Sequence, residues 1–134
     1  MTYAVAYVAT ALSFLVLDFI WLGFVAKTFY QREIGPLLLE NFNLVAAVGF
    51  YLVFVAGVVI FAVAPALQAG SWKTALLYGA LFGFFTYATY DMTNLATLKG
   101  WSPTVTIVDI AWGTFLTGTA ALLGYGATRT LAGG

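Results

Sequence analysis

The 134-residue chain has no cysteine and no histidine, and only five basic and five acidic side chains. Without these residues there can be no disulfide framework, no thiolate or imidazole metal site, no haem axial histidine and no Ser-His triad. The formal net charge is zero and no basic run is present, so the footprint of a nucleic-acid-binding protein is absent. Charged residues make up only 7% of the chain, which excludes an ordinary soluble domain.

What the chain has instead is apolar surface. Hydrophobic residues make up 63% of it, and the mean hydropathy is +0.98. Four long apolar runs predict an all-α membrane protein, an antiparallel bundle of four transmembrane helices in a single domain over residues 1–134. The predicted spans are residues 3–26, 43–65, 72–98 and 103–127, and residues 27–42 form a charged and aromatic interfacial loop.

Local signals set the expected boundaries. Asn43, Ser71 and Ser102 are placed to cap the starts of spans two, three and four. Pro65 is expected to end span two, because proline discourages continuation of a helix. Within the loop, residues 35–39 contain a Gly-Pro pair followed by three leucines, which predicts a short interfacial helix.

Three of the five acidic residues lie inside predicted spans. At 1.5 Å per residue, Asp18, Asp91 and Asp109 are about 12, 10 and 9 Å from the span ends that face loops one and three. They therefore share one depth and one half of the bilayer. No lysine or arginine lies inside a predicted span to neutralise them.

Each acid also stands in a row of residues spaced four apart, which stack on one face of a helix. The rows are Ala6, Thr10, Phe14 and Asp18; Gly79, Gly83, Tyr87 and Asp91; and Asp109, Gly113, Thr117 and Ala121. Small residues mark faces where helices approach closely in lipid, so each carboxyl is expected to point into the bundle.

Aromatic and polar side chains accompany the acids. Trp21 follows Asp18 by three residues and Trp112 follows Asp109 by three, which predicts an indole beside each carboxylate on its own helix. The most polar part of any span is residues 87–95. The predicted ligand or proton site contains Asp18, Asp91, Asp109, Tyr87, Tyr90, Asn94, Trp21 and Trp112. The sequence predicts no catalytic residue and no cofactor for it, and leaves a metal open.

Two interpretations of the acids remain. In the first, each Asp is protonated and donates one interhelical hydrogen bond, which is a purely structural role. In the second, the three carboxyls are close together and cannot all ionise in a medium of low dielectric constant unless a cation joins them. Such a cluster binds a cation, exchanges protons or does both, and aromatic neighbours favour an organic cation.

The acid-bearing segments, residues 17–23, 90–97 and 109–114, resemble a family of small four-span bacterial inner-membrane proteins known as domain of unknown function 2177. The resemblance covers nearly the whole chain and implies a multi-pass bacterial inner-membrane protein, with no catalytic assignment to transfer. In length and span count the chain is also similar to small multidrug-resistance transporters. Those exchange protons for organic cations through a Glu in the first span, whereas here three Asp lie on three spans.

The leading hypothesis is an acidic intramembrane pocket that binds, and in one version transports, a proton-coupled or cationic small ligand. It predicts that Asp91→Asn abolishes ligand binding or pH-dependent behaviour. The alternative is a non-catalytic helper subunit of a larger membrane complex, docking through a stripe on span two that contains Gly49, Val53 and Gly57. An enzyme acting on lipid is the least favoured class, because His, Cys and a metal set are lacking.

The expected surroundings are the lipid bilayer and either further copies of this chain or a membrane-protein partner, with no nucleic acid. Four short helices barely enclose a pathway, which favours a homo-oligomer. Loops one and three hold three basic residues and the opposite side holds two, so the positive-inside rule favours both termini outside.

Overall fold

The computed structural model describes residues 1–39 and 43–133, and throughout these ranges the regular structure is helical. Glu40 and Phe42, which belong to the predicted interfacial loop, lie outside the described residues. The elements in chain order are α1 (Thr2–Ile20), a π-helical turn η1 (Trp21–Val25), α2 (Ala26–Ile34), a 3-10 turn η2 (Gly35–Leu37), α3 (Leu44–Val58), a π-helical turn η3 (Val59–Val63), α4 (Ala64–Ala69), α5 (Trp72–Thr97) and α6 (Pro103–Leu131).

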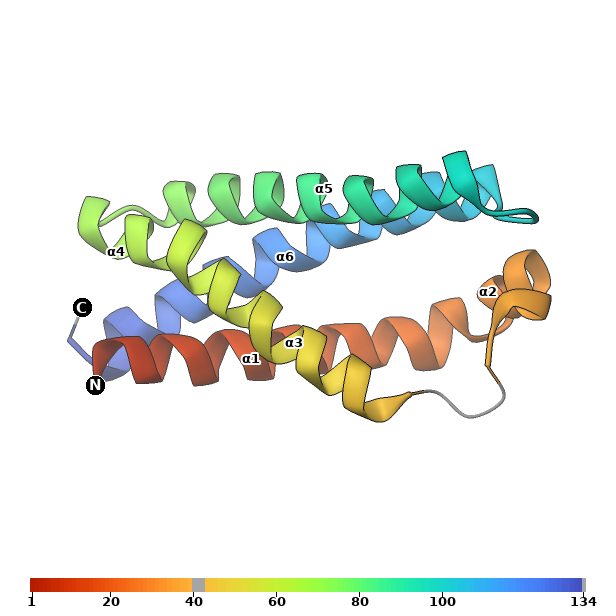
Figure 1. Ribbon diagram of the computed structural model, residues 1–134. Coiled ribbons are helices and arrows are strands. Elements are labelled where there is room, and N and C mark those ends of the chain that lie inside the picture. Colours follow the sequence, from red (N-terminus) through yellow and green to blue (C-terminus); the bar gives the residue numbers. More distant parts are fainter. Residues whose placement is uncertain (40–42, 134) are drawn as a thin grey trace.

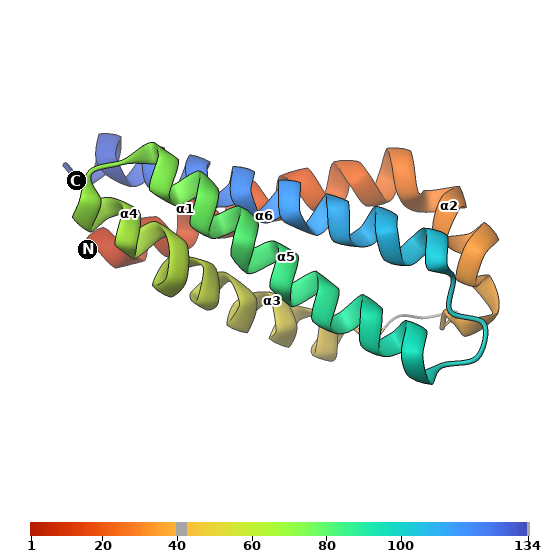
Figure 2. The same cartoon turned by 90° about the horizontal axis from the view of Figure 1, so that it is seen from above.

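The long helices lie lengthwise beside one another (Figure 1). The two termini and α4 lie at one end, and α2 lies at the other end with the turn between α5 and α6 (Figures 1 and 2). The most extensive helix contact is between α5 and α6, followed by that between α1 and α6. Helix α6 is therefore the central element of the fold.

Three of the described helical segments are long and apolar enough to cross a membrane: Thr2–Phe24, Leu44–Ala69 and Pro103–Leu131. Helix α5 has 26 residues, which at 1.5 Å per residue is about 39 Å and enough to span a bilayer. It is not among the three, because the polar side chains of residues 87–95 lower its hydropathy.

The predicted caps are confirmed. Asn43 accepts a hydrogen bond from the amide of Ala46, Ser71 from that of Thr74, and Ser102 from that of Val105. Each bond satisfies an amide that the first helical turn leaves without a partner. These three short polar residues set where α3, α5 and α6 begin.

The second long helix passes through Pro65, where the sequence predicts its end. A π-helical turn over Val59–Val63 precedes the proline, and the amide of Ala64 donates to the carbonyl of Val59 instead of to the residue four before it. The wider turn accommodates a ring that clashes with the ordinary α-helical register. The helix ends at Ala69, and Gly70 follows with a φ of 64°, the left-handed conformation that glycine adopts most readily.

The helix predicted at residues 35–39 also differs. The chain after span one is already helical over Ala26–Ile34 (α2), and Gly35–Leu37 adds one 3-10 turn with Pro36 near its start. The π-helical turn Trp21–Val25 joins this amphipathic helix to the apolar α1. Lys27 and Arg32 are exposed on α2, as a segment in the head-group layer requires.

The predicted rows do lie on buried faces. The buried residues of α1 are Ala6, Thr10, Phe14 and Asp18, which is the whole predicted row. On α5 and α6 the predicted glycines are buried at the helix contact: a Cβ on Gly79 would lie 2.6 Å from Ala121 Cβ, and one on Gly83 would lie 2.6 Å from Thr117 Cβ. Glycine at these positions lets the two backbones approach as closely as they do.

Candidate binding cavity

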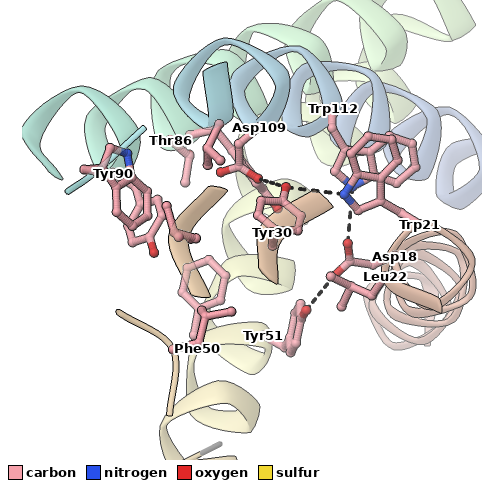
Figure 3. A pocket seen from close by; sticks show the side chains of 15 residues that line it. Asp18, Trp21, Leu22, Tyr30, Phe50, Tyr51, Thr86, Tyr90, Asp109 and Trp112 are labelled. Carbon is pink, nitrogen blue, oxygen red and sulfur yellow. Dashed lines mark hydrogen bonds between the residues drawn. The ribbon is translucent and has the colours of Figure 1, made fainter. Parts of the chain in front are cut away.

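A cavity of about 460 Å³ lies at the end of the molecule that carries α2 (Figure 3). It is lined mainly by aromatic and aliphatic side chains and contains two carboxyl groups. The lining residues are Asp18, Trp21, Leu22, Tyr30, Ile34, Leu38, Phe50, Tyr51, Thr86, Tyr87, Tyr90, Trp101, Val105, Asp109 and Trp112. Every long helix contributes to this wall.

Asp18, near the end of α1, is nearly buried, with 9% of its surface exposed. The hydroxyl of Tyr51 on α3 donates to its Oδ2 at 2.5 Å, and the indole Nε1 of Trp112 on α6 donates to its Oδ1 at 3.2 Å. Each carboxylate oxygen therefore has a donor from a different helix. Such donors stabilise the ionised form of a buried acid.

Asp109 on α6 is half-buried, and its Oδ1 accepts a hydrogen bond of 2.8 Å from the hydroxyl of Tyr30 on α2. The Tyr30 hydroxyl in turn accepts a hydrogen bond of 3.4 Å from the Nε1 of Trp21. Burial, and then the neighbouring Asp109 charge, raise the pKa of the Tyr30 phenol above its ordinary value of 10.0. The phenol therefore remains a donor to Asp109 over the physiological pH range.

The two indoles stack on each other, with ring centres 4.4 Å apart and planes inclined by 9°. The spacing of the sequence predicts an indole beside each carboxylate on its own helix, and the hydrogen bonds connect the indoles and carboxylates across helices. Trp112 of α6 donates to Asp18 of α1, whereas Trp21 reaches Asp109 only through Tyr30. Figure 3 shows this arrangement: the N–H of Trp112 reaches from α6 to Asp18 of α1, and the N–H of Trp21 is directed at Tyr30 of α2.

The opposite wall is aromatic. Tyr90 and Trp101 meet edge to face with ring centres 5.7 Å apart, and the lining also includes the rings of Phe50 and Tyr87. Tyr87 lies against Gly113, where a Cβ would overlap the phenol ring. The Nε1 of Trp101 is buried and has no hydrogen-bond partner among the described residues.

The structure thus brings together six of the eight residues of the predicted site: Asp18, Asp109, Tyr87, Tyr90, Trp21 and Trp112. Asp91 and Asn94 do not line the cavity. Asp91 is fully buried on the face of α5 that carries Gly79 and Gly83, and neither of its carboxyl oxygens accepts a hydrogen bond from the described residues.

Sequence reasoning missed Tyr30, Tyr51 and Trp101. Tyr30 belongs to the aromatic loop, but its contact with Asp109 spans 79 positions and leaves no local pattern. Tyr51 lies in an apolar span without periodic polar neighbours. Trp101 resembles an ordinary belt tryptophan at a span end, and only the fold turns it toward the cavity.

The charge of the cavity is one-sided. Among the described residues, two acids line it and no lysine or arginine does. Within residues 1–39 and 43–133 no group of three or more acidic residues has the geometry to hold a metal ion. Its chemistry is therefore that of two oriented carboxyl groups in an aromatic enclosure, which suits a large, weakly hydrated cation better than a small metal ion.

A helical chain with three segments able to cross a bilayer is an integral membrane protein. Residues 3–126 match the family described as predicted membrane protein (DUF2177), and the chain belongs to that family. No curated protein and no solved structure matches the chain.

Proposed function

We propose that this membrane protein binds an organic cation in the cavity between Asp18 and Asp109. The observation that carries the proposal is the combination of two oriented carboxyl groups and aromatic walls, with no basic residue among the described lining residues. A cation supplies the countercharge, and the aromatic faces add attraction of about 0.5–2 kcal/mol for each favourable contact.

The hydrogen bonds support this assignment. Tyr51 and Trp112 direct two donors at Asp18, and Tyr30 directs one at Asp109, so both acids are prepared to carry negative charge. Two negative charges in a poorly solvated cavity repel each other and are costly to desolvate. A bound cation removes both penalties, and a neutral ligand removes neither.

We also propose that the cavity lies inside an antiparallel bundle of four transmembrane helices. Helix α5 packs along the length of α6 and has the length of a span, so we assign it as the fourth transmembrane helix of an antiparallel bundle. The intramembrane acids have a clear use only in such a bundle, where they are shielded from acyl chains. The proposed location is the bacterial inner membrane, with homo-oligomers completing any pathway through it.

The test is binding of phenyltrimethylammonium to the purified protein, with its neutral carbon isostere tert-butylbenzene as the matched ligand. We expect the cation to bind at least about tenfold more tightly, which corresponds to about 1.4 kcal/mol. Asp18→Asn and Asp109→Asn should each weaken cation binding by about tenfold or more, because each removes a countercharge.

Glu33→Gln is the matched control. It removes the same formal charge from α2, but Glu33 lies outside the cavity lining and accepts a hydrogen bond from Ser102 that a glutamine can also accept. Equal affinity for the cation and its neutral isostere would refute the proposal. Uptake of the cation into proteoliposomes under a pH gradient then separates transport from simple binding.

The helper-subunit hypothesis makes a different prediction about α3. Gly49 is exposed and Val53 is 74% exposed, as an outward docking stripe requires, but Gly57 packs against Phe82 of the same chain. The surface available to a partner is thus smaller than predicted. Purification in mild detergent tests this alternative: a stoichiometric foreign membrane protein would support it, and a homo-oligomer would count against it.

A further inference from the structure

Asp91 is the buried carboxyl group that the proposed cation site does not use. Its side chain is 0% exposed, and neither carboxyl oxygen has a hydrogen-bond donor among the described residues. Asp18, in contrast, has two donors and Asp109 has one. A buried ionised carboxylate without a donor or a cation is strongly unfavourable, so Asp91 needs a different explanation.

The groups next to Asp91 explain how its carboxyl group can be buried. In the contact between α5 and α6, Gly83 lies against Thr117 and Tyr87 lies against Gly113. One further helical turn places Asp91 of α5 opposite Asp109 of α6, and the two carboxyl groups interact. The other titratable groups near this pair are the phenols of Tyr30 on α2 and of Tyr87 and Tyr90 on α5, and no lysine or arginine is among them. The only hydrogen bond to Asp109 from the described residues is the one that Tyr30 donates to Oδ1, so Oδ2 is free to accept another.

Two adjacent carboxyl groups in a medium of low dielectric constant cannot both ionise, and one proton between them turns repulsion into a hydrogen bond. The proton belongs on the acid with no other donor and no access to solvent, which is Asp91. Ionised Asp109 then keeps the donor from Tyr30 and borders the cavity, where a cation can stabilise its charge.

We infer that Asp91 is held protonated and donates a hydrogen bond to Asp109, which positions the Asp109 carboxylate toward the cavity. Asp91 is a positioning residue for the cation site, and its effect on binding rests on the proposed function. The protonation of the acid pair does not depend on that function, so the two are tested separately.

Infrared spectroscopy tests whether Asp91 is protonated. In a detergent without ester groups, the protein at neutral pH should show the carbonyl stretch of one protonated carboxylic acid, and Asp91→Asn should remove it. Asp18→Asn is the matched control and should leave the band in place, because both Asp18 oxygens already accept hydrogen bonds, from Tyr51 and from Trp112. A parent protein without this band, or a band that persists in Asp91→Asn, overturns the inference.

Cation binding tests whether Asp91 positions the Asp109 carboxylate. Asp91→Leu has a similar shape but no donor, and it should weaken phenyltrimethylammonium binding by about tenfold, the value of a hydrogen bond to a charged group. Asp91→Asn keeps an N–H donor at the same place and should bind much more tightly than Asp91→Leu. This expectation is the opposite of the loss of binding that the sequence alone predicts for Asp91→Asn.

Equal weakening by Asn and Leu overturns the positioning role, since it shows that the carboxyl itself is needed. Equal affinity of the parent and Asp91→Leu overturns it as well. If the parent protein does not bind the cation at all, the proposed function fails, and the infrared band still decides whether Asp91 holds a proton.

Discussion

The two halves of this molecule pack in opposite ways. In the compact half, defined by residues 75–83 of α5 and 117–124 of α6, small side chains bring the helices into close contact. In the cavity half, tyrosine and tryptophan fill the space between helices that diverge toward the turn joining α5 and α6 (Figure 2). The contrast shows that one bundle combines two kinds of packing. Small residues allow close helix contact, and large aromatic residues surround a cavity.

The compact half should be the more sensitive to added volume. Gly83→Leu introduces a side chain where even a Cβ would lie 2.6 Å from Thr117 Cβ, so we expect a loss of at least about 3 kcal/mol in unfolding free energy. Gly126→Ala is the control, because a Cβ there has no neighbour within 4 Å. Thermal unfolding in detergent measures both, and equal midpoints for the two variants would contradict the assigned helix contact.

In the cavity half, loss of a donor should affect binding more than folding. Trp112→Phe keeps an aromatic ring against Trp21 but removes the N–H that donates to Asp18. We expect a loss of about 1.5–3 kcal/mol in cation affinity, as for other hydrogen bonds to charged groups. Titration with phenyltrimethylammonium checks this, and Phe115→Leu, which alters an exposed neighbouring ring outside the lining, is the control.

Tyr30→Phe should change the response of stability to high pH. The pKa of Tyr30 is raised in the folded protein, so its stabilising contribution is complete below the ordinary pKa of 10.0 and is lost as the pH rises above it. The slope from this residue is at most about 1.4 kcal/mol per pH unit, because one phenol binds one proton. Solvent screening of the half-buried side chain narrows the pH range over which this slope applies. Unfolding from pH 8 to 11 should therefore be less pH-dependent in Tyr30→Phe than in the parent, and parallel profiles would disprove this.

The smallest expected difference lies between two helix caps. Ser71→Ala, at the compact end, removes one cap and should cost about 1 kcal/mol. Ser102→Ala removes a cap and also the hydrogen bond of 2.8 Å to Glu33 that joins α2 to α6. We expect an additional loss of about 0.5–1 kcal/mol and faster proteolysis within α2, measured by limited digestion. Identical stability and digestion of the two variants would show that the Glu33 contact contributes nothing.

Much of the helix packing and of the helix boundaries can be predicted from the sequence, because their signals are local. The row from Ala6 to Asp18 on α1 and the glycines of α5 follow a four-residue spacing, and the helix turns that spacing into a buried face. The starts of α3, α5 and α6 each follow from one capping residue. Pro65 is the exception: its local signal predicts a helix end, and the π-helical turn before it allows the helix to continue to Ala69.

The cavity half is less predictable. The acids and their tryptophans can be found from the sequence, since carboxyls are rare and expensive within a membrane span. The sequence does not reveal which donor binds which acid. The hydrogen bond from Trp112 to Asp18 joins residues 94 positions apart, and that from Tyr30 to Asp109 joins residues 79 positions apart. The separate place of Asp91, behind the cavity wall and facing Asp109, also has no local signal.

The sequence by itself determined that this is a helical membrane protein of the family described as predicted membrane protein, and it determined which face of each acid-bearing helix is buried. Composition and the helical period are sufficient for both, because lipid requires backbone groups to be satisfied within each helix. Only the tertiary structure decided that Asp18 and Asp109 border one cavity while Asp91 does not, since helix rotation and crossing decide which side chains meet.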